Sequence, residues 1–445
     1  MKTQATTKFA ICACALAAVF AKCGAATPQI TSMSVAQNND GSLSVAYSID
    51  TDAIVTMDML TNGVSIGPDK VATVVGDLNV KVSAGSGKRG TWFARNDWPD
   101  MVAANATVKL TAWSVGAPPD YMAIDLTVPT VVRYYVSSNA VPYGVTNALY
   151  KTDVLLLRKI PARGVIWRMG QPSTAEPNGG TDLTNGLGGN GTFDNETGHL
   201  VMMTNDYYCA VYETTQRQYF RIIGSNPSNF KQETEESLAK SGPVWFRPVE
   251  STSYDTLRGT ASASHYNWPV HGHEVAASSS IGKFRSHSGV STLDLPTEAQ
   301  WEYACRAGTG TGANTGVDAT SANLQSLAWF NLNAEDATHA VGQKIPNAWG
   351  LYDMHGNVTE LCLDWAVGGD AYRATFAEGY ATGAVTFEPT GPVRTESLTS
   401  GVRAFRGGEY NYSAQHQRSA ARRARVSATP HQRTGFRLVC TIPVE

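Results

Sequence analysis

The chain has 445 residues, of which 42% are hydrophobic and 16% charged, and its formal net charge is −3. This low charge and the spread of Trp and Tyr favour a buried core over disorder, and the length favours two or three domains. Near-neutral charge removes the general attraction to nucleic acid. No apolar run after the first 30 residues approaches the roughly 20 needed to cross a membrane, which excludes a polytopic membrane protein.

Residues 1–26 are typical of a secretory signal peptide. Lys2 and Lys8 precede an apolar run at 9–20, and small residues follow at 23–26. We expect cleavage after Ala25 or Ala26. Lys22 stands where a lipoprotein signal needs a small residue, so lipidation is not expected. The mature protein is expected to be secreted, periplasmic or on the cell surface.

Residues 27–133 are expected to form a β-sandwich of immunoglobulin or fibronectin type. Apolar residues alternate with polar ones at 43–49 and again at 108–112, as in strands with one buried face. Turn residues at 38–41 separate two such strands, and residues 84–87 are predicted to form a hairpin turn. No constellation of His, Asp or Cys accompanies them, so a spacer or adhesive domain is the simplest interpretation. A linker is expected at 134–153.

Four cysteines remain after the signal peptide: Cys209, Cys305, Cys362 and Cys440. In an oxidising compartment they allow three full disulfide pairings, and buried free thiols are an equal alternative. They form no C-x-x-C motif, so a redox dithiol or a zinc knuckle is not expected.

Residues 154–445 form the second predicted domain, which is rich in loops, including an exposed one at 178–198. Thr215 and Gln218 fit a capping box, and Gly224 would end the helix that follows. A second helix is predicted after Thr297, ending at Gly308, with Trp301, Ala304 and Cys305 on its inner face. Its Glu298 and Glu302 lie four residues apart. We expect them to stabilise the start of the helix through its dipole rather than to act in catalysis.

This second helix carries a family resemblance. The sequence LPTEAQWEYACRAG at 295–308 resembles a signature of the formylglycine-generating enzyme and sulfatase-modifying factor family. NAWGLYDMHGNVTE at 347–360 resembles the family's central loop, and RGGEYNY at 406–412 and GFRLV at 435–439 resemble its C-terminal strands. Segments at 167–170 and 210–216 resemble its opening. The resemblance implies an α+β, loop-rich variant of the C-type lectin fold.

In family members that make formylglycine, two cysteines hold a cuprous ion that activates oxygen. The matching positions here are Tyr412 and Gln417, and Glu409 stands where a serine usually follows the paired glycines. A phenol and an amide are poor ligands for Cu(I), which prefers thiolates. Copper is therefore not expected at this site, and no catalytic residue is assigned.

A calcium site is expected from the same resemblance. Asp353, Gly356, Val358 and Glu360 match the positions that form a calcium site in family enzymes. The first and last would offer side-chain oxygens and the middle two would offer backbone carbonyls, which suits a structural calcium ion. The alternative is that Asp353 and Glu360 cap turns around Gly356. A second calcium loop is not recognisable between Asn323 and Val341.

A histidine group, His265, His271 and His273 followed by Glu274, is a second candidate for a metal, since imidazoles suit zinc or iron. Related iron-dependent sulfoxide synthases take such histidines from a helical bundle. Strands, not a bundle, are predicted before this domain, and Trp268 and Pro269 interrupt the segment. A polar surface loop is the favoured interpretation.

Eight arginines lie between Arg403 and Arg437, with Glu409 as the only acidic residue. Those inside the family motifs are expected to make internal hydrogen bonds. The freer ones could bind phosphate, sulfate or a carboxylate, and with neighbouring aromatic and amide groups they could line a ligand groove. The predicted ligand-binding residues are Glu409, Tyr410, Tyr412, Gln417, Arg422, Arg423 and Arg425.

The sequence thus predicts an exported protein of the sulfatase-modifying factor type that lacks the copper cysteines. Its expected role is to bind a peptide, a glycan or a protein partner. The alternative is a protein-modifying oxidase of the formylglycine-generating type with a different metal arrangement.

Overall fold

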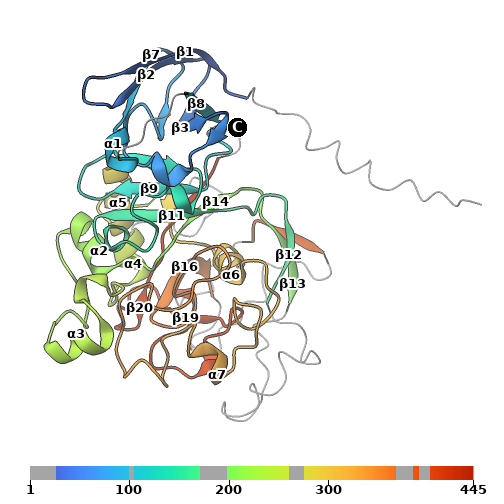
Figure 1. Ribbon diagram of the computed structural model, residues 1–445. Coiled ribbons are helices and arrows are strands. Elements are labelled where there is room, and N and C mark those ends of the chain that lie inside the picture. Colours follow the sequence, from blue (N-terminus) through green and yellow to red (C-terminus); the bar gives the residue numbers. More distant parts are fainter. Residues whose placement is uncertain are drawn as a thin grey trace, which may run out of the picture.

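The computed structural model of the protein describes residues 27–99, 105–170, 198–259, 275–366, 384–389 and 401–443. The predicted signal peptide, the histidine group at 265–274 and nearly all of the predicted loop at 178–198 lie outside these ranges. The described part is a mixed α+β structure with short helices and predominant β-sheet (Figure 1). None of the described helices is long and apolar enough to cross a membrane.

Two sheets form the N-terminal part. One has the strand order β1-β2-β7-β5, and the other has the order β4-β3-β6 with β8 paired to β3. Apolar side chains of both sheets, among them Tyr47, Val55 and Trp92, form one hydrophobic cluster. The bounds of these elements are β1 Ile30–Gln37, β2 Leu43–Ile49, β3 Ala53–Thr61, β4 Val64–Ser65, β5 Val74–Gly76, β6 Val80–Val82, β7 Gly85–Trp92, α1 Ala94–Asp97 and β8 Ala106–Trp113.

The alternation predicted for 43–49 is confirmed, because Val45, Tyr47 and Ile49 of β2 are buried. The hairpin turn predicted at 84–87 is wrong. Strand β6 pairs with β3 in one sheet, whereas β7, which begins at Gly85, pairs with β2 in the other. The short segment between them therefore carries the chain from sheet to sheet.

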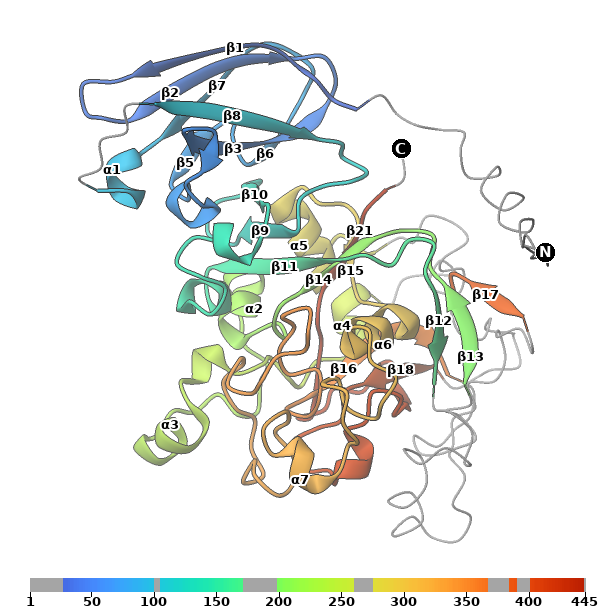
Figure 2. The same cartoon turned by 45° about the vertical axis from the view of Figure 1, so that its right-hand side comes forward.

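A six-stranded sheet forms the centre of the molecule, below the N-terminal sheets in Figure 2, with the order β10-β9-β11-β14-β21-β15. One face packs on helices through a cluster that includes Leu157, Tyr219 and Phe284, and the other face holds a second cluster around Leu156 and Tyr212. Its strands are β9 Tyr121–Asp125, β10 Val132–Tyr135, β11 Val154–Ile160, β14 Tyr207–Ala210, β15 Leu293–Asp294 and β21 Val439–Thr441.

The segment predicted as a linker, 134–153, is packed into this sheet. Its Tyr135 and Tyr150 are buried, and the Tyr134 amide donates to the Asn79 carbonyl of the N-terminal part at 2.7 Å. Strand β9, inside the predicted sandwich range, also belongs to the six-stranded sheet. The boundary between the N-terminal sheets and the six-stranded sheet therefore lies before Tyr121.

A four-stranded sheet of order β19-β18-β16-β20 carries three of the predicted site residues, Glu360 on β16 and Arg423 and Arg425 on β19, and the others lie in segments between strands. Its strands are β16 Thr359–Trp365, β18 Val402–Arg406, β19 Arg423–Val426 and β20 Thr434–Gly435, and a third, smaller sheet joins β12 Ile166–Met169, β13 His199–Met202 and β17 Val385–Phe387. The helices of this half are α2 Gln216–Ile223, α3 Glu235–Ser241, α4 Tyr254–Arg258, α5 Ser280–Ser288, α6 Glu298–Arg306 and α7 Ser321–Leu324.

Both predicted helices are confirmed at their N-termini. Thr215 caps α2 and Thr297 caps α6, each with a complete capping box, and Gly224 ends α2 in the left-handed conformation. Helix α6 ends one residue earlier than predicted, because Ala307 takes the left-handed conformation with a φ of 46°. Trp301, Ala304 and Cys305 are buried, as predicted for its inner face.

Candidate functional site

The segment that follows β18 brings most of the predicted ligand residues together. Gly407 and Gly408 have φ values of 96° and 77°, which turn the chain back on itself after the strand. A Cβ on Gly408 would lie 2.0 Å from Oε1 of Gln417 and 2.8 Å from the His416 carbonyl oxygen. The second glycine is therefore required for the two arms of this loop to touch.

Gln417 fixes the loop. Its side chain is fully buried, and its Nε2 donates to the carbonyl oxygens of Glu409 at 3.0 Å and Tyr412 at 3.2 Å. The resemblance places a copper thiolate at this position. In this protein the Gln417 amide instead holds the backbone of Glu409 and Tyr412, the other two residues that match the family's active-site positions.

Glu409 and Tyr410 lie beneath the surface rather than on it. The Glu409 carboxylate is fully buried, and its Oε1 accepts a hydrogen bond from Nη1 of Arg433 at 3.2 Å. Burial raises the pKa of Glu409 above its usual value, although Arg433, Arg425 and Arg423 oppose the shift. The Tyr410 ring packs edge-on against Phe230. The sequence predicted that both residues line a ligand groove, but both are buried and neither lines an exposed surface.

Tyr412, Arg423 and Arg425 do reach the surface. The guanidinium of Arg423 lies 3.9 Å from the centroid of the Tyr412 ring, and that of Arg433 lies 5.6 Å from it. Arg425 donates to the Thr434 hydroxyl at 2.9 Å. This group of partly exposed side chains, Tyr412, His416, Arg423, Arg425, His431 and Arg433, is called the arginine–tyrosine patch below.

His416, His431 and Arg433 were not among the predicted ligand residues. Arg433 was counted only as one of the eight arginines, and the two histidines carried no motif. Burial, followed by the charges of neighbouring arginines, lowers the pKa of His416 to about 3 and that of His431 to about 4. Both imidazoles are therefore neutral at neutral pH. The clustering of arginines in this stretch was the sequence feature that could have pointed to these three residues.

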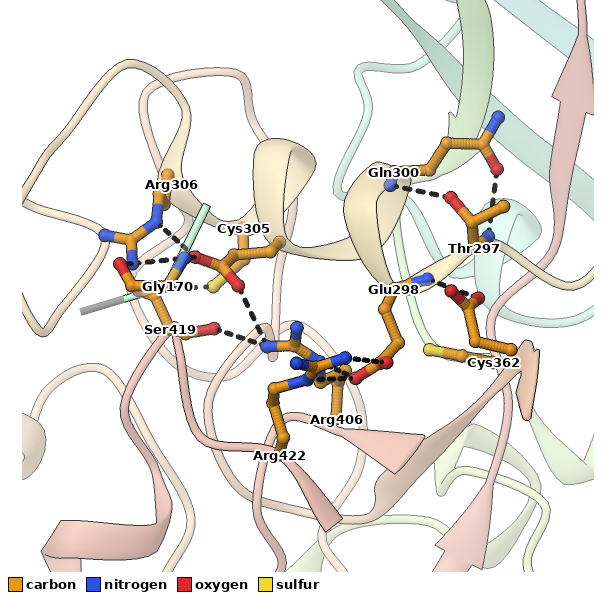
Figure 3. Close-up of polar contacts among 12 residues, drawn as sticks. Gly170, Thr297, Glu298, Gln300, Cys305, Arg306, Cys362, Arg406, Ser419 and Arg422 are labelled. Atoms are coloured by element: carbon orange, nitrogen blue, oxygen red, sulfur yellow. Dashed lines mark hydrogen bonds and ion pairs between the residues drawn. The ribbon is translucent and has the colours of Figure 1, made fainter. Parts of the chain in front are cut away.

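Arg422, predicted to be available to a ligand, is instead buried in an ion-pair network (Figure 3). Its Nε donates to Oε1 of Glu298 at 2.9 Å, and its Nη2 pairs with Oε2 of the same carboxylate. Arg406 bridges the two acidic residues of α6, with 2.7 Å to Glu298 and 3.0 Å to Glu302. The prediction for Arg422 is wrong, because side chains on the buried face of β18 and the following segment meet α6.

Glu298 and Glu302 are likewise structural, but not for the predicted reason. Both are fully buried, and Glu302 also pairs with Arg306 at 2.8 Å and accepts a hydrogen bond from the Gly170 amide at 2.8 Å. Burial opposes ionisation, yet the paired arginines hold the pKa of each below its usual value. Direct ion pairs, rather than the helix dipole, explain these residues.

The four predicted calcium ligands are all buried but have different surroundings, since Asp353, Gly356 and Val358 lie in a loop and Glu360 lies on β16. Oδ2 of Asp353 accepts from the Gly342 amide at 2.7 Å, while its Oδ1 has no hydrogen-bond partner. Burial raises the pKa of Asp353 to about 6. The Gly356 amide donates to the Gly407 carbonyl, and the Val358 amide donates to Glu213.

Glu360 has cationic and indole partners instead. Arg437 reaches Oε1 of Glu360 at 2.8 Å and Oε2 at 3.0 Å, and Trp301 donates to Oε2 at 2.7 Å. A guanidinium in that position repels a divalent cation. Glu360 therefore does not suit a cation site, whereas Asp353 keeps one carboxylate oxygen without a hydrogen-bond partner. Within the described ranges, no group of three or more His, Cys, Asp or Glu converges as metal ligands would.

The four cysteines are free thiols and are buried. Burial raises the pKa of Cys209 and of Cys305 to about 12, and that of Cys440 to about 11. The thiolate form that Cu(I) requires is thus disfavoured at each. The sequence left disulfides and buried free thiols as alternatives, and the structure has four buried free thiols.

Comparison with known proteins gives a consistent family. The model of the "Sulfatase-modifying factor enzyme 1-like domain" matches residues 173–442, more than half of the chain. A formylglycine-generating enzyme of Streptomyces coelicolor is 30% identical over 204 residues, which cover 44% of this chain and 56% of that protein. The "Chaperone protein LppX" of Paenibacillus barcinonensis is 30% identical over 190 residues, covering 36% of this chain and 63% of that protein.

The chain thus spans less than two thirds of the length of these relatives. Among solved structures, "Treponema denticola variable protein 1" is similar with a TM-score of 0.47 and 22% identity, over 65% of this chain and 96% of that one. PvdO from Pseudomonas aeruginosa has a TM-score of 0.43 and 18% identity, over 64% of this chain and 94% of its own.

Proposed function

Because the chain belongs to the sulfatase-modifying factor enzyme 1-like family, we propose that it is a ligand- or partner-binding member without the copper chemistry of the formylglycine-generating type. One observation carries the proposal. Tyr412 and Gln417 stand at the positions that match the family's copper cysteines, and the Gln417 amide is bonded to the loop backbone. An amide and a phenol do not anchor Cu(I).

The remaining thiols support this proposal. Cys209, Cys305 and Cys362 belong to the hydrophobic core between α6 and the neighbouring sheets, and Cys440 is also buried. None of them extends from the loop that holds Tyr412 and Gln417. A pair of soft ligands beside an exposed surface would require this core to open.

The ligand surface that we propose is the arginine–tyrosine patch, and the ligand classes are a peptide, a glycan or a protein partner. Tyr412, Arg423 and Arg425 are the predicted residues that reach this surface, while Glu409, Tyr410, Gln417 and Arg422 support it from below. Aromatic and guanidinium groups side by side are common in recognition sites.

Several further features belong to the same proposal. We propose that the protein is exported after loss of residues 1–26, and that the part from 154 onward is a C-type-lectin-like variant preceded by a β-sandwich. A structural calcium ion is proposed at Asp353, whose unpartnered Oδ1 supports it. The ion pair between Arg437 and Glu360 limits the ligands to the other residues of that loop.

The test is an aerobic assay on a cysteine-containing sulfatase peptide with added Cu(I), read out as aldehyde formation and as copper per chain. We expect neither turnover nor stoichiometric copper. The double variant Tyr412→Cys/Gln417→Cys is the matched positive control, since it restores two thiols at the matching positions, and we expect it to retain about one Cu(I). Aldehyde formation by the unmodified protein would establish the oxidase alternative and overturn the binding proposal.

A further inference from the structure

Helix α2, which lies above α3 in Figure 1, carries part of a partly exposed aromatic and cationic cluster. Phe220 of α2 is 37% exposed, and Trp245 of the single turn η5, Val244–Phe246, is 39% exposed. Their ring centroids are 5.4 Å apart. The guanidinium of Arg217 lies 5.2 Å from the centroid of the Trp245 ring and 6.0 Å from that of Phe220. These three side chains are called the Trp245 cluster below.

The hydrophobic core does not account for these rings. Helix α2 packs on the core through Tyr219, which is buried, whereas the adjacent Phe220 is exposed. A single exposed apolar side chain is ordinary, but two aromatic rings in contact with each other and with an arginine form a continuous surface. Trp, Phe and Arg are the residues that are enriched in protein interfaces and their hot spots. The composition of the cluster therefore favours a protein-binding surface.

Arg217 has no acidic partner to neutralise it. Its guanidinium contacts the two rings, and no acidic side chain in the described ranges forms an ion pair with it. Arg221, one turn further along α2, instead pairs with Asp153 at 2.7 Å. Arg217 stands in the first turn of the helix, where an acidic residue would be more stabilising, so the stability of α2 does not explain this cation. The planar guanidinium suits a carboxylate, which it can bind through two parallel hydrogen bonds.

The orientation of the two rings favours a protein side chain over a sugar. The planes of Phe220 and Trp245 are tilted by 59° to each other, so the pair forms a wedge rather than a flat platform. An aromatic or branched aliphatic side chain can contact both walls of a wedge, and aromatic rings pack well in this tilted geometry. A sugar ring would instead need a flat aromatic face to stack on.

We propose that the Trp245 cluster docks a protein segment that carries an apolar side chain next to a carboxylate. The apolar side chain contacts Phe220 and Trp245, and the carboxylate pairs with Arg217. The cluster shares no residue with the arginine–tyrosine patch, so this is a second binding surface, and it does not depend on the function proposed above. Three side chains bury much less than the roughly 1,200 Å² of a stable complex, so the docking is weak and reversible.

The test selects peptides from a phage-displayed library of random dodecapeptides on the full chain, because multivalent display compensates for weak single contacts. Phage that bind the Arg217→Glu variant are removed first, so that the retained peptides depend on this cation. We expect the retained peptides to carry Asp or Glu next to Phe, Trp, Leu or Ile. Their recovery should fall about tenfold on Arg217→Gln, as for the loss of one charge-assisted contact, and similarly on Trp245→Ala.

Arg163→Gln is the matched control, since it removes an exposed cation elsewhere, and it should leave recovery unchanged. The Arg217→Glu variant, used as the target of a separate selection, should enrich peptides with Lys or Arg next to the same apolar residues. Misfolding cannot produce that reversal of charge preference.

Four results would overturn this inference. They are the absence of retained peptides, retained peptides without a carboxylate, recovery that does not change in Trp245→Ala, and an equal fall in recovery with Arg163→Gln. Binding of an oligogalacturonate that depends on Arg217, without retention of acidic peptides, would identify an anionic glycan as the ligand and would also overturn it.

Discussion

Arg422 and Glu298 are 124 residues apart in the sequence, yet the Nε of the arginine lies 2.9 Å from the Oε1 of the carboxylate in the interior of the protein. The contact joins α6 to the segment that leads into β19. Arg406 shares the same carboxylate. The network therefore fixes the position of the strand that carries Arg423 and Arg425.

Removing the shared carboxylate should be costly. Glu298→Gln leaves two buried guanidiniums with one fewer anionic partner, and we expect it to lower the free energy of unfolding by about 3–5 kcal/mol. Urea denaturation at pH 7 measures this loss. Asp153→Asn, which breaks the half-exposed pair with Arg221, is the control and should have a much smaller effect. Equal losses in the two variants would contradict a special role for the network.

The buried Asp364 should make stability depend on pH. Burial and the neighbouring charge of Glu298 raise its pKa to about 7 in the folded protein, against 3.8 ordinarily. The folded state then binds more protons than the unfolded state between those values, so this group's contribution to stability falls as the pH rises from about 4 to 7.

Asp364→Asn removes that dependence while keeping an acceptor for the Glu298 amide. We expect the variant to be about 1–3 kcal/mol more stable than the unmodified protein at pH 8, and the difference to shrink towards pH 4. Chemical denaturation across this pH range tests it, with the exposed Asp69→Asn as control. Lower stability of Asp364→Asn at pH 8 would contradict the sign.

Calcium should raise the melting temperature if Asp353 is a ligand. At a concentration of about 100 times the Kd, binding contributes roughly 2.7 kcal/mol, which corresponds to a few degrees for a chain of this size. Thermal melts after EDTA treatment, with and without added calcium, measure the shift, and Asp353→Asn should abolish it. The same shift in Asp353→Asn would place the ion elsewhere.

The buried thiols should be unreactive until the protein unfolds. A thiol reagent added to the folded protein should label none of Cys209, Cys305, Cys362 and Cys440, because access is blocked and burial disfavours the thiolate. In guanidinium without reductant all four should react. Four unreactive cysteines in guanidinium would instead indicate disulfides.

Local features of this fold could be predicted from the sequence, whereas its long-range contacts could not. The caps of α2 and α6 depend on residues three apart, and the alternation in β2 depends on its own side chains, so both were visible. Arg422 and Arg423 are adjacent and chemically identical in the sequence. Only the packing of α6 against β18 decides that the first is buried and the second reaches the surface.

The same limit applies to residues 84–87 and to the predicted calcium loop. The turn residues were recognisable, but which strands they join depends on a sheet order that no local pattern encodes. Glu360 fits a metal ligand by motif. Its partner Arg437 is 77 residues away, so the competing ion pair could not be anticipated.

The place of β21 in the central sheet has a consequence for biosynthesis. This strand, Val439–Thr441, fills the position between β14 and β15, whose residues precede it by more than a hundred positions. A growing polypeptide therefore cannot close the sheet until residue 441 has emerged from the ribosome, and until then two strand edges stay open to aggregation.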